Sequence, residues 1–262
     1  RVLSLAPIFI FVHAADDYLL VPVINSGGAI LSGIISLWVV MSIFKIRFYV
    51  PPLQEIIASL KHSSHFFASR VSVSLYTVSN SFVLGLFGTN TMVGYYSAAE
   101  KLFIAIQSAY IPVNNSLYPY MTKTKNVPLF KKILLYVTIL NVAGICVLLF
   151  VTAPVVYLIY GITDAESVLT LKLLLIACLV IVPSILLGYP FLGALGYSKY
   201  TNQSVIISSL FHLAGLAALV ITGTLSIYAV AGMVIITETI VLSIRLWGVR
   251  KYKLFSLPAT AS

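Results

Sequence analysis

The sequence VGYYSAAEKLFIAIQSAYIPVNNSLYPY, residues 93–120, decides how the rest of the chain is interpreted. It is an apolar run long enough for a membrane helix, yet Glu100 and Lys101 lie near its middle. An ionisable side chain costs about 2.5–3.5 kcal/mol within a membrane, so this helix must turn a polar face away from lipid. At helical spacing that face holds Gly94, Ser97, Lys101, Ala105, Ser108, Pro112, Asn115 and Pro119, with Tyr96, Glu100, Gln107 and Asn114 beside it. We expect it to look onto other helices or a water-filled cavity.

The composition is that of a polytopic membrane protein. Of the 262 residues 60% are hydrophobic and 9% are charged, whereas soluble domains are about half apolar and a quarter charged. The net charge of +9 comes from basic residues placed between hydrophobic runs. It therefore reports membrane topology, and no nucleic-acid partner is expected.

Eight hydrophobic segments are predicted, which makes the fold an all-α bundle of about eight transmembrane helices. We expect bends at Pro112, Pro183 or Pro190 in the two longest segments. The segments are 1–14, 22–44, 65–87, 92–120, 130–153, 169–195, 200–223 and 226–247.

The loops between these segments alternate in charge. One side carries Arg1, Lys45, Arg47, Lys61, Lys123, Lys125, Lys131, Lys132, Lys199, Arg250, Lys251 and Lys253. The other side carries Asp16, Asp17, Asp164 and Glu166. Because positive loops stay inside, we expect both ends of this chain in the cytoplasm.

The 45–64 loop is the best domain boundary, since Pro51 and Pro52 disfavour a continuous helix there. A short amphipathic helix is expected at 54–60. Residues 1–44 are then the last two helices of an N-terminal lobe, 45–64 a cytoplasmic linker, 65–253 a six-helix lobe and 254–262 a cytoplasmic tail.

Several stretches resemble one family of transporters. VGYYSAAEK (93–101) and LYPYMTK (117–123) are similar to the polysaccharide transport family, the Wzx-type O-antigen flippases. DDYLLVPVINSGG (16–28) and GIISLW (33–38) resemble it in the same order. The resemblance implies a twelve-helix, two-lobe fold like that of the MATE exporters. The chain starts where the fifth helix would, so we expect a fragment without the first four helices.

The resemblance also implies a function. A flippase of this family moves an undecaprenyl-diphosphate-linked oligosaccharide from the cytoplasmic to the periplasmic leaflet of the bacterial inner membrane. Membrane lipids surround it, and the polysaccharide polymerase machinery is a candidate partner. Two alternatives stay open: a MATE-like drug exporter, and a membrane-embedded glycosyltransferase or polymerase, which the short outer loops disfavour.

Two basic residues are candidates for binding an anionic substrate. Arg70 lies in a serine-rich helix and Lys101 in the next helix. Together they would suit phosphate oxygens in a shared cavity. The alternatives are that Arg70 reaches the membrane surface and that Lys101 pairs with an acid elsewhere. Glu100 is expected to meet another helix or to titrate.

A second candidate pair is His212 and Glu238, which helix lengths place at similar depths. Such a pair can relay protons or simply fix helix packing by a hydrogen bond. The expected substrate-binding residues are thus Arg70, Lys101, Tyr76, Asn80, Gln107 and Asn115, and the coupling residues are Glu100, His212 and Glu238. No cofactor, catalytic group or metal site is expected: the histidines form no ligand cluster with Cys146 and Cys178, which we expect to be small buried hydrophobes.

Overall fold

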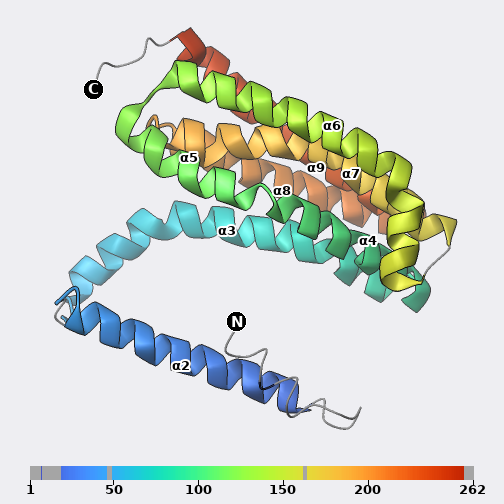
Figure 1. The fold of residues 1–262 in the computed structure, drawn as a ribbon, viewed down its shortest axis with the longest axis horizontal. Coiled ribbons are helices and arrows are strands. Elements are labelled where there is room, and N and C mark those ends of the chain that lie inside the picture. The colour runs from blue at the N-terminus through green and yellow to red at the C-terminus, as the bar shows by residue number, and fades with distance from the viewer. Residues whose placement is uncertain (1–6, 8–18, 46–48, 162–163, 257–262) are drawn as a thin grey trace. The chain divides into compact units, whose positions relative to one another are not determined.

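The computed structural model describes residue 7 and residues 19–45, 49–161 and 164–256. Within these ranges the secondary structure is helical (Figure 1). The α-helices are α2 (Leu20–Ser42), α3 (Leu53–Phe87), α4 (Asn90–Ser108), α5 (Ile111–Thr124), α6 (Val127–Tyr160), α7 (Ala165–Leu186), α8 (Ser198–Ile221) and α9 (Ile227–Lys251). A π-helical segment, Leu187–Gly193, follows α7, and a short 3-10 helix, Leu254–Ser256, follows α9.

The fold is an all-α bundle of a multi-pass membrane protein, as predicted. Five of the described helices are long and apolar enough to cross a membrane: α2, α6, α7 with its π-helical segment, α8 and α9. The predicted segments 65–87 and 92–120 form helices but do not meet this standard, because serines and charged residues interrupt them. The segment 1–14, apart from residue 7, and the acidic residues Asp16 and Asp17 lie outside the described residues.

The chain divides into two compact units, residues 1–59 and 60–262. The division falls within the linker predicted at 45–64, although the domain assignment itself stays a prediction. The separate helix expected at 54–60 is wrong, since α3 runs unbroken from Leu53 to Phe87. No proline or glycine stands between Leu53 and Val83 to stop it. Pro51 and Pro52 precede its first turn, where their missing N–H groups cost nothing.

Proline also shapes the predicted segment 92–120, which forms two helices instead of one. α4 ends at Ser108 and α5 begins at Ile111, with Pro112 in the first turn of α5. A proline cannot donate to the carbonyl four residues earlier, so the helix restarts there. The bend predicted at Pro112 therefore takes the form of a break, and a short loop separates α4 from α5 (Figure 1).

α7 is the central helix of the second unit. It packs against α4, α6 and α9, while α8 packs against α9. Its buried side chains form an apolar core that includes Leu174, Leu175 and Cys178. Cys178 is thus the small buried hydrophobe expected, whereas Cys146 is exposed, so that prediction is wrong for one of the two. Cys146 follows the buried Ile145, and because neighbouring positions on a helix point about 100° apart it lies on a different, exposed face of α6.

Candidate functional site

A polar cavity lies inside the second unit, among α3, α4, α7, α8 and α9. One part measures about 340 Å³ and reaches Tyr76, Glu100 and Glu238. An adjoining part of about 470 Å³ reaches Asn114, Gly188 and Tyr189. Both parts are lined by Arg70, Val73, Ile185, Val205 and Arg245. We call the two parts together the polar cavity.

The inward face of α3 supplies one wall. Ser69, Asn80 and Leu84 are buried along this face, with Val73 and Tyr76 half-buried between them. These positions recur every three or four residues, so they form one stripe of the helix. The predicted residues Tyr76 and Asn80 therefore line the polar cavity.

Arg245 on α9 is the deepest cation of the site and is only 7% exposed. Its Nε donates to Ser204 Oγ at 3.1 Å, and its Nη1 donates to the carbonyl and hydroxyl oxygens of Ser184 at 2.6 and 3.2 Å. Three hydrogen bonds thus join α9 to α7 and α8. These contacts hold the guanidinium group on the wall of the polar cavity.

Arg245 also lies against the bend after α7. Gly188 has a non-helical ψ of −120° there, so the bend expected near Pro183 or Pro190 is present. A β-carbon at Gly188 would lie 3.0 Å from Nη1 of Arg245. A side chain larger than that of glycine would press on the guanidinium group, which its hydrogen bonds to Ser184 and Ser204 hold in place.

Sequence reasoning missed Arg245. Its signal was its spacing from Glu238: the two residues are seven positions apart on α9, which places them on the same face two turns apart. Both line the polar cavity. The spacing of Arg245 from Glu238 thus indicates, from the sequence alone, a second charged group in the same site.

The Glu238 carboxylate is buried and accepts a hydrogen bond from the Tyr76 hydroxyl at 3.0 Å. His212, on the neighbouring α8, is also buried. Its ring lies 5.8 Å from that of Tyr76, measured between centroids. His212 and Glu238 therefore approach the same tyrosine instead of forming the direct pair that the sequence suggested.

The hydrogen bonds of His212 go elsewhere. Nδ1 lies 2.7 Å from Thr237 Oγ1, and Nε2 lies 2.8 Å from Asn80 Oδ1. The Thr237 hydroxyl donates its proton to the Met233 carbonyl at 2.7 Å, so it accepts from Nδ1–H. A protonated ring satisfies both contacts as they stand, whereas a neutral ring requires the Asn80 amide group to turn its NH₂ toward Nε2. The orientation of Asn80 is thus linked to a proton on His212.

The other predicted residues divide into two groups. Glu100 lines the polar cavity and accepts a hydrogen bond from Ser81 of α3 at 3.1 Å, so it meets another helix as expected. Gln107 also lines the cavity. Lys101 and Asn115 are exposed and do not line it.

Neighbouring positions on a helix point about 100° apart, so Lys101 cannot share the direction of Glu100. The cationic pair that the structure brings to the cavity is Arg70 with Arg245, in place of Arg70 with Lys101. Asn114, and not the predicted Asn115, lines the polar cavity. Its buried Oδ1 has no hydrogen-bond partner in the described residues.

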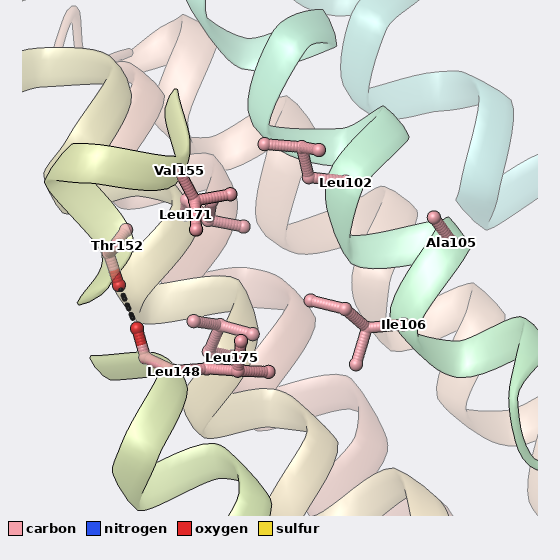
Figure 2. A pocket seen from close by; sticks show the side chains of 8 residues that line it. All are labelled: Leu102, Ala105, Ile106, Leu148, Thr152, Val155, Leu171 and Leu175. Carbon is pink, nitrogen blue, oxygen red and sulfur yellow. Dashed lines mark hydrogen bonds between the residues drawn. The ribbon is translucent and has the colours of Figure 1, made fainter. Parts of the chain in front are cut away.

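A separate apolar pocket lies among α4, α6 and α7 (Figure 2). It measures about 300 Å³ and is lined almost entirely by hydrocarbon, including Leu102, Ile106 and Leu175. Its hydroxyl group, on Thr152, donates to the Leu148 carbonyl at 2.7 Å and is satisfied within its own helix. This pocket therefore offers no free polar group to orient a charged substrate.

Comparisons with known proteins found one family and two curated relatives that are similar to this chain. Residues 1–125 match the family described as "Polysaccharide biosynthesis protein". A protein of Escherichia coli (strain K12), named "Putative O-antigen transporter", is 27% identical over 259 residues, which is 96% of this chain. A protein of the same name from Shigella dysenteriae is 29% identical over 139 residues, or 53% of this chain.

The chain spans 62% of the length of the Escherichia coli relative, and its match to the Shigella relative covers 35% of that protein. No solved structure matches. The family match lies in the N-terminal half, while the longer relative aligns along almost the whole chain and so extends the relationship through α9. The chain is therefore similar to this family along residues 1–125 and to the Escherichia coli O-antigen transporter along almost its whole length.

Proposed function

We propose that this protein is a transporter that flips an undecaprenyl-diphosphate-linked polysaccharide repeat unit from the cytoplasmic to the periplasmic leaflet of the inner membrane. The observation that carries the proposal is the polar cavity within an apolar helical bundle, with Arg70 and Arg245 on its wall. Polar groups at membrane depth are costly and usually mark a substrate pathway. The names of the two relatives support the same class of cargo.

The two arginines suit the charged part of such a substrate. Three donor contacts of Arg245 are already taken by Ser184 and Ser204, which leaves the second terminal nitrogen of the fork for a ligand. Arg70 is exposed and can move toward the same ligand. Arg70 can bind phosphate oxygens by two parallel hydrogen bonds, and Arg245 can add a charge-assisted donor from its remaining nitrogen, so this pair fits a diphosphate better than a neutral sugar.

The sugar would meet the neutral polar side chains of the same cavity. Tyr76, Asn80 and Gln107 contribute hydroxyl and amide groups to one part, and Asn114 contributes its free amide oxygen to the other. Such groups donate to and accept from sugar hydroxyls without a charge. The substrate would then place its diphosphate at the arginines and its sugar along these residues.

Transport against a gradient needs a source of free energy, and Glu238 with His212 is the best candidate site for a coupled proton. Both side chains are buried and touch Tyr76, which joins them to the polar cavity. Glu100 is a second carboxyl group on the same cavity. If Glu238 carries the coupled proton, the transport rate of the wild-type protein depends on pH and that of the Glu238→Gln variant does not. A transport rate that is independent of pH in both proteins would rule out proton coupling at Glu238.

The proposed orientation places the basic ends of the helices in the cytoplasm. Lys123 and Lys125 end α5, while Arg250 and Lys251 end α9. The Lys131 ammonium group, near the start of α6, donates to the carbonyl of Phe255 after α9 at 3.3 Å. These basic segments therefore share one end of the bundle (Figure 1), which supports a common cytoplasmic side.

The test uses the gene for this protein in a strain that lacks its own O-antigen transporter. Surface polysaccharide is measured for wild type, Arg70→Ala and Arg245→Lys at matched membrane levels. Lys132→Ala, which removes an exposed cation away from the cavity, is the control. We expect wild type and the control to restore polysaccharide and both arginine variants to fail. Equal restoration by all four would contradict the proposed role of the arginines.

A drug exporter is the second candidate function, because Glu100 and Glu238 place two carboxyl groups on the same cavity. Such groups suit a cationic drug. In that case wild type would raise drug resistance without restoring polysaccharide, and loss of the carboxyl groups would abolish resistance while loss of Arg70 would not.

A further inference from the structure

A second, apolar groove lies on the outer side of α3, where this helix passes α8. It measures about 910 Å³. Its walls include Phe67, Val71, Leu75, Val78 and Phe82 of α3 and Leu213 of α8. At 1.5 Å per residue, the α3 wall from Phe67 to Phe82 is about 22 Å long. The groove thus follows the outer face of α3, with Leu213 of α8 at its edge, and is lined by hydrocarbon, unlike the polar cavity on the opposite side of the helix.

Arg70 belongs to both surfaces. It lines the apolar groove and also both parts of the polar cavity. On α3 it stands between the inward stripe that holds Val73 and Tyr76 and the outward stripe that holds Val71 and Val78. A ligand held by the guanidinium group therefore has hydrogen-bonding groups on one side and a hydrocarbon surface on the other.

This arrangement selects a ligand with three parts: a polar head, an anion and a long apolar chain. A positive charge at the junction attracts phosphate and repels a cationic head group. The length of the groove along a single helix suits one extended chain. The polar cavity, with hydroxyl and amide groups on its wall, takes a head much larger than that of a common phospholipid.

We propose that the groove between α3 and α8 holds the isoprenoid chain of the lipid carrier, with its phosphate at Arg70 and its sugar in the polar cavity. This rests on the proposed function and identifies how the substrate is held. The groove contributes position more than affinity, because lipid tails around the protein are as apolar as its walls. It keeps the chain in the bilayer while the sugar crosses through the protein.

The test is photo-crosslinking in membranes that contain a radiolabelled undecaprenyl-diphosphate-linked oligosaccharide. A photoreactive side chain replaces Val78 in the groove or, as the matched control, Val147 on α6. The two valines have similar exposures of 65% and 61%, and only Val78 lines the groove. We expect strong labelling at position 78 and weak labelling at 147.

Arg70→Gln supplies the second arm, since it removes the charge at the junction and leaves the groove in place. Loss of a charge-assisted hydrogen bond costs about 1.5 kcal/mol, so labelling at position 78 should fall about tenfold at limiting probe. Equal labelling at 78 and 147, or labelling at 78 that survives Arg70→Gln, would overturn the proposal. So would displacement of the probe by excess phosphatidylglycerol, because the groove would then be a general lipid site.

The polysaccharide assay separates this proposal from the proposed function. Labelling at position 78 that depends on Arg70, in a protein that never restores surface polysaccharide, supports the groove and rejects the transport function. Restored polysaccharide with labelling equal at 78 and 147 supports the transport function and rejects the groove.

Discussion

The hydrogen bond between Arg245 and Ser204 can be measured by a double-mutant cycle. Arg245→Gln removes the guanidinium group, and Ser204→Ala removes the hydroxyl that accepts from Nε at 3.1 Å. Each variant is measured alone and in combination, so that the cycle isolates this one contact from the bonds that Arg245 makes to Ser184. The quantity is the free energy of unfolding, measured by denaturant titration in detergent.

The magnitudes follow from the three contacts. Polar contacts between membrane helices average about 0.6 kcal/mol and reach about 1.7. Arg245→Gln loses three of them, so we expect a destabilisation of about 2 kcal/mol, while Ser204→Ala costs about 0.6. The cycle should give a coupling energy between about 0.6 and 1.7 kcal/mol, because the contact is buried and charge-assisted.

The control is Ser243→Ala, also a serine hydroxyl, on the same helix as Arg245. Its hydroxyl donates to the Thr239 carbonyl within α9, so its partner is not Arg245. The cycle of Ser243→Ala with Arg245→Gln should be additive within about 0.3–0.5 kcal/mol. Additivity in the Ser204 cycle as well would refute the claim that Arg245 ties α9 to α8.

Three further predictions test other parts of the site. Gly188→Ala should lower the free energy of unfolding by about 1–3 kcal/mol, because its β-carbon would lie 3.0 Å from a guanidinium nitrogen of Arg245. Gly232→Ala is the control and should not lower it, because a β-carbon at Gly232 would meet open space. Tyr76→Phe should reduce polysaccharide transport at normal membrane levels, since the carboxylate of Glu238 loses its hydrogen-bond donor; unchanged transport would contradict the role of this pair. Lys101→Ala should leave transport near the wild-type level, because its side chain is exposed and does not line the polar cavity; a loss of export at matched protein levels would restore the cationic role expected from the sequence.

The membrane class and the helix positions were readable from the sequence, because hydrophobic length has a direct physical meaning in a bilayer. α8 and α9 lie within four residues of their predicted bounds, whereas α6 runs seven residues beyond its predicted end at residue 153. The break at Pro112 was also predictable, because proline itself lacks the backbone N–H that would continue the helix. The start of α3 differs from the prediction because polar residues such as Lys61 and Ser64, which favour a loop in a membrane protein, continue the helix instead.

The candidate site was only partly predictable. Tyr76, Asn80, Glu100, Gln107 and Glu238 line the polar cavity, which agrees with their polar positions in apolar helices. These predictions follow from the cost of exposing a polar group to lipid, and this cost depends on the residue type alone. Their roles in binding and coupling stay predictions.

What the sequence determined by itself is therefore a helical membrane protein with polar faces, because lengths, charges and proline positions are local properties. What only the tertiary structure decided is which polar groups meet. It brought Arg245 from α9 to Arg70 of α3, and it joined His212 and Glu238 through Tyr76. A helix fixes the direction of each side chain about its own axis, but the neighbour on that side is set by how the helices pack.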